Sequence, residues 1–411
     1  MLRLAFFFHA NLLYAEYPFN KIGEIVEQSY WPVLDSLFSL DNTRVVCNFT
    51  GFTLEVLAGE HPELYGGHPR LIRLIREALA QKRLELTGTS WAHTILPTLP
   101  LYLQHSDLDL YLQTCKRILN LCPQGFFPPE LAVSPYLPEL LNLKGYRWCI
   151  VDRELLFYSG EGLLNNANDF TKSYLAFTKQ LAQAQQAGLF QKLKALRRLR
   201  SNLKRHSDYR PRLLEGTNGK TILAFLLDSS WIALALFSFS HFFLFNEKSL
   251  IHFIRRAKKR FRGFLFPYST DIEFLGIGGN TLTDAIPIER LKQFFKLLAA
   301  EGIELTLPSG YLTSHHQEGH LQYCKAGSWS TDKDFKLWQA DPDNKVLNQI
   351  ADEAWQAFSS YQGKLDPNTK EEMLKALLLA FNSDGRGWNP LPEHRLFCYN
   401  QALKVIRACD K

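Results

Sequence analysis

The sequence of 411 residues has none of the cysteine patterns that mark disulfide-stabilised or zinc-binding proteins. It contains no C-x-x-C pair, and its seven cysteines are an odd number at scattered spacings. Such a set forms neither a disulfide framework nor a structural zinc site, so we expect reduced thiols and a cytoplasmic protein. The cysteines are Cys47, Cys115, Cys122, Cys149, Cys324, Cys398 and Cys409.

The sequence also lacks a strong excess of one charge. Its formal net charge of +6 is modest for this length and does not by itself indicate a nucleic-acid partner. Basic residues concentrate in residues 192–205, which have the pattern of a polar helix. Because few aromatic residues interleave with these charges, we interpret the segment as a solvated helical insertion near residues 160–220. A site for RNA or another acidic partner is the alternative.

Apolar runs long enough to cross a membrane are missing as well. The first 17 residues hold a short apolar run that meets His9 and Asn11, with no clear small-residue cleavage site, so we expect a buried strand rather than a signal peptide. Residues 221–246 are apolar and aromatic, but Asp228 and His241 interrupt them. We expect two strands there, at residues 222–227 and 232–239, and no membrane span.

What the sequence does contain is a large apolar fraction arranged in alternating patterns. Hydrophobic residues make up 46% and aromatic residues 13%, enough for a large core and a cleft that binds sugar rings. Apolar runs of strand length alternate with helical patterns through the first 320 residues, which predicts βα units and a parallel sheet. The predicted strands include residues 2–8, 45–49, 84–87, 147–151, 263–267 and 304–307.

The number of these units favours a barrel over an open sheet. Beyond about residue 325 the patterns are helical, at residues 345–358, 371–380 and 392–408. We therefore predict an α/β barrel domain over residues 1–320, containing the basic helical insertion, and a helical C-terminal domain over residues 321–411 that completes the cleft.

Two carboxylates follow predicted strands and are the candidates for catalysis. Glu130 lies in the rigid stretch GFFPPELAVSP, residues 125–135, and Asp271 lies in YSTDIEFLG, residues 268–276. Catalytic groups of barrels lie at the carboxyl ends of strands, so both would face one rim. Paired carboxylates on either side of a glycosidic bond are the usual groups of glycoside hydrolysis. A charge at a helix N-terminus is the alternative for Glu130.

Five short segments resemble, in order along the chain, the five sequence regions of glycoside hydrolase family 57. Each alone is weakly specific, but their common order between residues 9 and 338 is specific. The segments are His9-Ala-Asn11-Leu-Leu-Tyr14, then Leu84-Glu85-Leu86 with Trp91, His93 and Pro97, then Phe127-Pro-Pro-Glu130, then Thr270-Asp271-Ile-Glu273-Phe-Leu-Gly276, and finally Ser328-Trp329-Ser-Thr-Asp332-Lys-Asp334-Phe-Lys-Leu-Trp338.

This resemblance implies a (β/α)7-type distorted barrel with a helical domain behind it, and retaining chemistry on α-linked glucans. It implies that Glu130 is the nucleophile and Asp271 the general acid/base. The segments depart from the family pattern at Asn11, Leu13 and Lys82-Arg83, which leaves the sugar specificity open. The further substrate-binding candidates in the matching segments are His9, Asn11, Glu85, Trp91, His93, Glu273, Trp329, Asp332 and Trp338.

Several of these candidates have a second interpretation. The tryptophans offer flat faces for sugar rings but also suit a core. Glu273 lies on the same side as Asp271 if the segment is extended, which would make it a supporting acid. Asp152, at the end of a strand, could orient a substrate hydroxyl or form an ion pair with Arg153 or Arg147. Residues 382–390 are a polar and aromatic loop that could add a subsite or merely connect two helices.

We therefore expect an intracellular retaining enzyme on α-1,4-glucans that needs no cofactor and no metal. Transfer of the sugar chain, as in a 4-α-glucanotransferase or branching enzyme, is the alternative to hydrolysis. A non-catalytic glucan-binding barrel is the alternative of another class. A metal-dependent deacetylase is disfavoured, because the H-x-x-x-H in residues 315–320 lies in a loop and no Asp-Asp pair ends the first strand.

Overall fold

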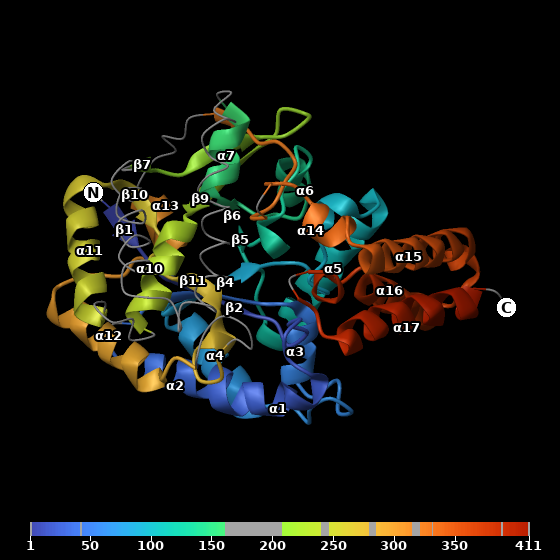
Figure 1. Ribbon diagram of the computed structural model, residues 1–411, viewed down its shortest axis with the longest axis horizontal. Coiled ribbons are helices and arrows are strands. Elements are labelled where there is room, and N and C mark those ends of the chain that lie inside the picture. Colours follow the sequence, from blue (N-terminus) through green and yellow to red (C-terminus); the bar gives the residue numbers. More distant parts are fainter. Residues whose placement is uncertain are drawn as a thin grey trace.

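A parallel sheet curved into a barrel forms the centre of the molecule (Figure 1). The structure is a computed structural model that describes residues 2–41, 43–160, 208–239, 246–278, 285–314, 321–330, 332–387 and 389–409. The basic segment 192–205 and the histidine-containing segment 315–320 lie outside the described residues. In the described part of the chain, no helix combines the length and apolar character that a membrane crossing needs.

Seven strand positions make up the barrel wall. The first and last positions are each split in two, and the strands pair in parallel in the order β10 with β11, β1 with β2, β3, β4, β5, β6 and β9. Their bounds are β1 Leu2–Leu4, β2 Phe6–Ala10, β3 Val45–Phe49, β4 Leu84–Gly88, β5 Gly125–Phe126, β6 Trp148–Asp152, β9 Thr221–Leu227, β10 Arg262–Leu265 and β11 Ser269–Asp271.

The barrel is distorted where β9 faces β10. The rings of Phe225 in β9 and Phe264 in β10 meet edge to face with their centroids 4.9 Å apart. Among the described strands, β7 (Asp208–Tyr209) pairs with the edge of β10 there, while β8 (Arg212–Glu215) and β12 (Leu321–Tyr323) extend the sheet beyond β9. This is the (β/α)7-type distorted barrel that the sequence predicted.

Helices follow the strands and surround the barrel (Figure 1). Apolar stripes on them pack against the outer faces of the strands, which are therefore covered on both sides. These helices are α1 Ile22–Ile25, α2 Trp31–Phe38, α3 Gly51–Leu57, α4 Pro69–Ala80, α5 Leu101–Leu119, α6 Leu137–Leu143, α7 Arg153–Gly160, α10 Ser229–Phe239, α11 Glu247–Arg260, α12 Ile288–Ala300 and α13 Pro308–Ser314.

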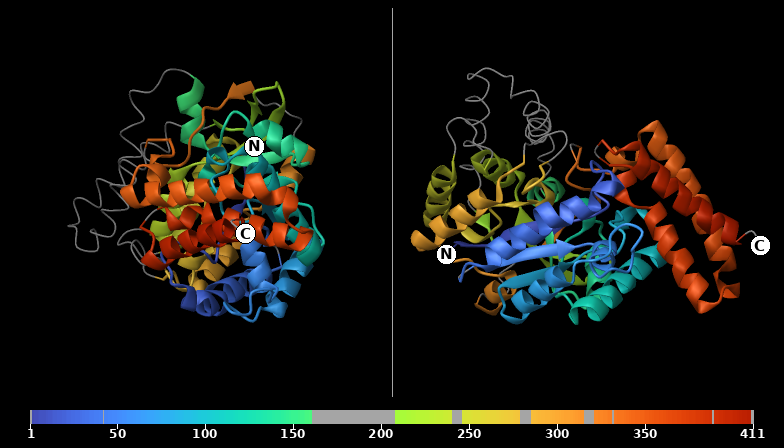
Figure 2. Two further views of the ribbon diagram at one scale, coloured as in Figure 1. Left: turned by 90° about the vertical axis from the view of Figure 1, so that its right-hand side faces the viewer. Right: turned by 90° about the horizontal axis from the view of Figure 1, so that it is seen from below.

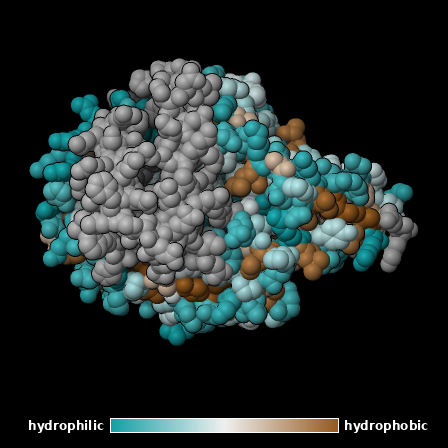
Figure 3. Space-filling view, in the orientation of Figure 1, coloured by the Kyte–Doolittle hydropathy of each residue, from teal (hydrophilic) through white to brown (hydrophobic). Residues whose placement is uncertain are grey.

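The C-terminal helices form a separate layer against one end of the barrel, away from the N-terminus (Figure 2). They are α14 Lys336–Gln339, α15 Pro342–Tyr361, α16 Pro367–Ala380 and α17 Pro392–Cys409. Both α15 and α16 begin with an Asp-Pro pair, in which the aspartate side chain accepts hydrogen bonds from the first turn and the proline fixes the first helical φ. Figure 3 shows hydrophobic residues at the surface of this layer, where Val346 and Leu396 are exposed.

The barrel interior is apolar at one end and polar at the other. Phe7 on β2 and Val46 on β3 point inward and pack in an interior cluster with Phe225 and Phe264. Side chains alternate along a strand, so the residues two positions further on, His9 and Asn48, point inward at the next level. The polar end of the interior therefore lies at the carboxyl ends of the strands, where the candidate catalytic residues are.

Two strand predictions were wrong. Residues 229–239 form helix α10, because an apolar run without a period does not distinguish a strand from a buried helix. The turn at Asp228, whose carboxylate binds Arg153 and Tyr209, ends β9 before this helix. Residues 304–307 donate one hydrogen bond, from Thr306 N to Leu4 O, and then turn into α13.

Close packing at Gly125 gives a test of this fold. A Cβ at this position would lie 2.1 Å from the Trp148 ring. We expect Gly125→Ala to lower the free energy of unfolding by about 1–3 kcal/mol through overpacking, measured by urea denaturation. Gly66→Ala is the control, since its Cβ would meet nothing within 4 Å. Equal stability of the two variants would show that β5 and β6 are not packed as described.

Candidate active site

Glu130 lies directly beyond the short strand β5, in a tight turn. Phe127 points into the barrel, with its ring 4.8 Å from Phe7 and 5.3 Å from His9. The two prolines that follow bring the chain to Glu130, which has φ of 57° and ψ of 21°. Positive φ is unfavourable for residues other than glycine, so the surrounding contacts must hold this turn.

Two segments far along the chain bind the carboxylate of Glu130. Trp329 donates from Nε1 to Oε2 at 2.6 Å, and Ser383 donates from Oγ to Oε1 at 3.1 Å. The backbones also meet, because Val133 exchanges hydrogen bonds of 2.8 and 3.0 Å with Gly327. Glu130 therefore has a donor on each oxygen and stays half-buried, with part of its surface open to solvent.

Asp271 ends strand β11, and its Cα pairs in register with that of His9 on β2. It too is half-buried. The chain then turns into a single 3-10 turn, Ile272–Phe274, so the extended segment expected there is absent. Glu273 in this turn is fully buried and accepts hydrogen bonds from the Tyr30 hydroxyl and from Asn11 N.

Buried polar side chains support the two acids from behind. The rings of His9 and His93 lie 5.0 Å apart, and His9 Nδ1 is hydrogen-bonded to Asn48 Oδ1. His93 Nδ1 lies 3.1 Å from Asp384 Oδ2 and 2.8 Å from Ser383 Oγ. Together these side chains connect the strand ends to the C-terminal loop around residues 382–386.

The surroundings of the two acids differ in charge. Burial raises the pKa of Asp271, and the charges of Glu273 and Glu130 raise it well above its usual range. Burial also raises the pKa of Glu130, but the cation of His93 and the hydrogen bonds from Trp329 and Ser383 oppose this rise. The arrangement favours a protonated Asp271 beside an ionised Glu130.

The two histidines carry different charges. Burial would lower the pKa of His93, but the charge and hydrogen bond of Asp384, with Glu130 and Asp271 beyond, raise that pKa to about 9. Burial and the cation of His93 lower the pKa of His9 to about 3. His93 is therefore the cation of the site, and Asp384, whose pKa it lowers against the effect of burial, is its counter-ion.

Asn11 holds this counter-ion in place. Its side chain donates to Asp384 Oδ2 at 2.7 Å, and it is 1% exposed. It therefore supports the site from behind, whereas the sequence placed it at the substrate. Of the predicted tryptophans, Trp329 keeps an accessible part, whereas Trp338 packs edge to face behind it at 6.0 Å and is buried.

Other predicted site residues lie elsewhere. Trp91 is 1% exposed and donates to Glu55 at 3.2 Å, which makes it a core residue. Glu85 lies three positions before the end of β4, about 10 Å from the rim at the usual rise per residue, and accepts hydrogen bonds from Ser309. Asp332 is exposed on a loop.

Asp152 forms an ion pair, but with a different partner from the two expected. Its Oδ2 accepts from Lys333 Nζ at 2.7 Å, and its Oδ1 accepts from Glu154 N at 2.7 Å at the start of α7. Arg153 instead pairs with Asp228 at 3.3 Å. Both carboxylate oxygens of Asp152 are thus engaged within the protein.

Sequence reasoning missed Ser383, Asp384 and Lys333. The dense polar loop at residues 382–390 was noticed, and its first part does reach Glu130. Its local signal was the polar Asn382-Ser-Asp384 run directly after the apolar helix α16. For Lys333 no local signal marks a buried cation.

Comparisons with known proteins agree with this architecture. The family model described as glycosyl hydrolase family 57 matches residues 5–323. None of the curated protein sequences compared with the chain matches it significantly.

Solved structures of similar fold include three glucan-active enzymes. A GH57 branching enzyme from Thermococcus kodakaraensis is 14% identical with a TM-score of 0.66, over 99% of this chain and 88% of that one. A 4-α-glucanotransferase from Thermococcus litoralis is 16% identical with a TM-score of 0.65, over 99% and 60%. The α-amylase AmyC from Thermotoga maritima is 14% identical with a TM-score of 0.64, over 98% and 91%. At such identities the likeness shows a shared fold.

The ion pair of His93 with Asp384 should contribute to stability in a defined pH window. The contribution of His93 is complete below pH 6.5 and is lost as the pH rises through about 9, because its pKa is raised in the folded state. The contribution of Asp384 is complete above pH 3.8 and is lost as the pH falls through its lowered pKa. We expect Asp384→Asn to lower the free energy of unfolding by about 2–4 kcal/mol between these limits.

Urea denaturation from pH 4 to pH 10 measures this difference, which should shrink toward the alkaline end. The control is Asp343→Asn, which removes an exposed partner of Arg395 and should change stability little. A difference for Asp384→Asn that does not vary with pH would contradict the assigned charges.

Proposed function

The chain belongs to glycosyl hydrolase family 57, and from this premise we propose that it is a retaining enzyme that cleaves α-1,4-glucans. The substrate class is supported by the printed activities of the similar structures, which are a branching enzyme, a 4-α-glucanotransferase and an α-amylase. The seven cysteines are free thiols, which fits a protein that works in a reducing compartment.

One observation carries the assignment of roles. Glu130 and Asp271 are both half-buried at the rim, and their surroundings are opposite in charge. Donors from Trp329 and Ser383 and the cation of His93 favour an ionised Glu130. Neighbouring carboxylates favour a protonated Asp271. A nucleophile needs the first state, and a general acid needs the second.

The reaction then proceeds in two displacements. In the first, a Glu130 oxygen forms a bond to the anomeric carbon while the bond to the leaving glycosidic oxygen breaks, and Asp271 gives its proton to that oxygen. In the second, Asp271 takes a proton from water or a sugar hydroxyl as this acceptor attacks the anomeric carbon. The bond to Glu130 breaks, and the carboxylate is restored.

The acceptor in the second step separates the two forms of the proposal. Incubation with maltoheptaose followed by product sizing distinguishes them. Shorter products alone mean hydrolysis, whereas both shorter and longer products mean chain transfer. Retained glucan binding without any new product would support the non-catalytic glucan-binding alternative and contradict the proposal.

Substitution of each acid tests the assigned roles. We expect Glu130→Gln and Asp271→Asn each to lower kcat on maltoheptaose by at least about 1000-fold, because each removes a group that acts in the transition state. The variants should differ on α-maltosyl fluoride, whose leaving group needs no proton. Formation of the glycosyl-enzyme should recover in Asp271→Asn and stay absent in Glu130→Gln.

Glu63→Gln, an exposed acid, serves as the control and should keep the activity of the parent enzyme. If Glu130→Gln recovered on the fluoride and Asp271→Asn did not, the two roles would be reversed.

A further inference from the structure

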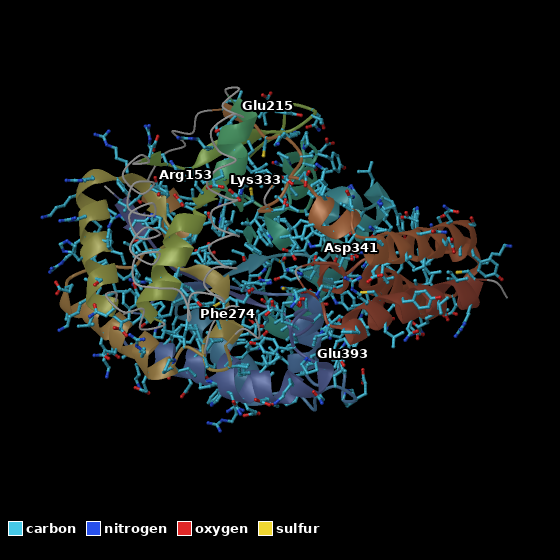
Figure 4. The ribbon with its side chains drawn as sticks, in the orientation of Figure 1. Arg153, Glu215, Phe274, Lys333, Asp341 and Glu393 are labelled. Atoms are coloured by element: carbon cyan, nitrogen blue, oxygen red, sulfur yellow. The ribbon has the colours of Figure 1, made fainter. Side chains whose placement is uncertain are left out.

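A buried lysine links the end of strand β6 to the loop that carries Trp329. Lys333 is 2% exposed, and its ammonium lies 2.7 Å from Asp152 Oδ2 and 3.1 Å from Glu154 Oε2. The same ammonium donates to Trp329 O at 3.3 Å. Figure 4 labels Lys333 close to the start of α7, where Arg153 is also labelled.

The backbone at this position is unusual. Lys333 has φ of 53°, a conformation that costs free energy for any residue with a side chain. A lysine is also among the side chains least often buried. The contacts of the ammonium must offset both costs, and Asp152 and Glu154 keep it charged by raising its pKa against the effect of burial.

The loop that Lys333 fastens is folded tightly on itself. Ser328 and Ser330 each donate from Oγ to Asp334 O at 2.7 Å, and the Lys333 backbone donates to Ser330 O at 3.0 Å. A Cβ on Gly327 would lie 2.2 Å from Lys333 O. Movement at Lys333 is therefore transmitted to Gly327 and Trp329.

This loop in turn holds the turn of Glu130. Gly327 exchanges two backbone hydrogen bonds with Val133, Trp329 N donates to Glu130 O at 3.3 Å, and the Trp329 indole donates to the carboxylate. A continuous chain of contacts thus runs from β6 through Lys333 to Glu130.

We propose that Lys333 is a positioning residue that fixes the Trp329 indole, and through it the Glu130 carboxylate, against the end of strand β6. This inference rests on the proposed function for its kinetic consequence. Its structural consequence, the placement of Trp329, does not depend on that function.

The test uses Lys333→Gly, because glycine adopts positive φ without strain and the substitution removes only the ammonium arm. With Trp329→Phe it forms a double-mutant cycle on the kcat/KM for maltoheptaose. We expect each single variant to lose about 10- to 100-fold, and the double variant to lose no more than Trp329→Phe alone. Losses that multiply in the double variant would contradict the proposal.

A second measurement needs no turnover. The emission of Trp329 is obtained as the difference between two spectra, one recorded with Trp329 present and one recorded with Trp329→Phe. This difference is taken once in the parent enzyme and once in proteins that also carry Lys333→Gly. We expect acrylamide to quench the Trp329 emission more strongly in Lys333→Gly than in the parent enzyme. Unchanged quenching would contradict the proposal even if activity fell.

Three controls separate this inference from other outcomes. Lys336→Met removes a lysine of the same region with a 72% exposed side chain, and it should change neither readout. If Lys333→Gly does not fold, Asp152→Asn replaces it, since asparagine keeps the Oδ1 acceptor for Glu154 N and removes the charge that holds the ammonium. If the parent enzyme turns over no α-glucan, the proposed function fails, and the quenching result alone decides the role of Lys333.

Discussion

The pair of hydrogen bonds on the Glu130 carboxylate is the interaction on which the rest of the site depends. Glu130 stands in a left-handed turn after a strand of two residues, and neither feature would hold it alone. Trp329 and Ser383 each bind one of its oxygens across 199 and 253 positions of the chain. The barrel therefore supplies the position of the acid, and two later segments supply its orientation and its ionisation. This division of roles explains why the C-terminal layer packs against the carboxyl end of the barrel.

Charge is arranged around this carboxylate in two opposed groups. On one side the cation of His93 is balanced by Asp384, which Asn11 holds. On the other side Asp271 is flanked by the buried Glu273 and by Glu130 itself. Groups removed from water interact strongly, so small differences in neighbours separate the protonation states of two similar acids. The same burial leaves Glu130 and Asp271, together with the face of Trp329, as the parts of the site that a substrate can reach.

The sequence predicted the barrel and both acids because these have local signatures. Apolar runs that alternate with helical periods indicate βα units, and Phe127-Pro-Pro-Glu130 and Thr270-Asp271 lie where such strands end. The contacts of the site have no such signature. The pairing of Lys333 with Asp152 joins residues 181 positions apart, and the burial of Trp91 and Glu85 depends on which way a strand or loop turns. An apolar run such as residues 229–239 has no period, so its helix was read as a strand.

The most direct test of the account is to identify the residue that becomes glycosylated. In the Asp271→Asn variant, an α-maltosyl fluoride should form the glycosyl-enzyme without an acid, and the loss of the general base should slow its release. Proteolysis and mass spectrometry of the trapped protein should then place one maltosyl group on the peptide that contains Glu130. A maltosyl group on any other residue, or turnover to products of inverted anomeric configuration without an adduct, would contradict Glu130 as the nucleophile.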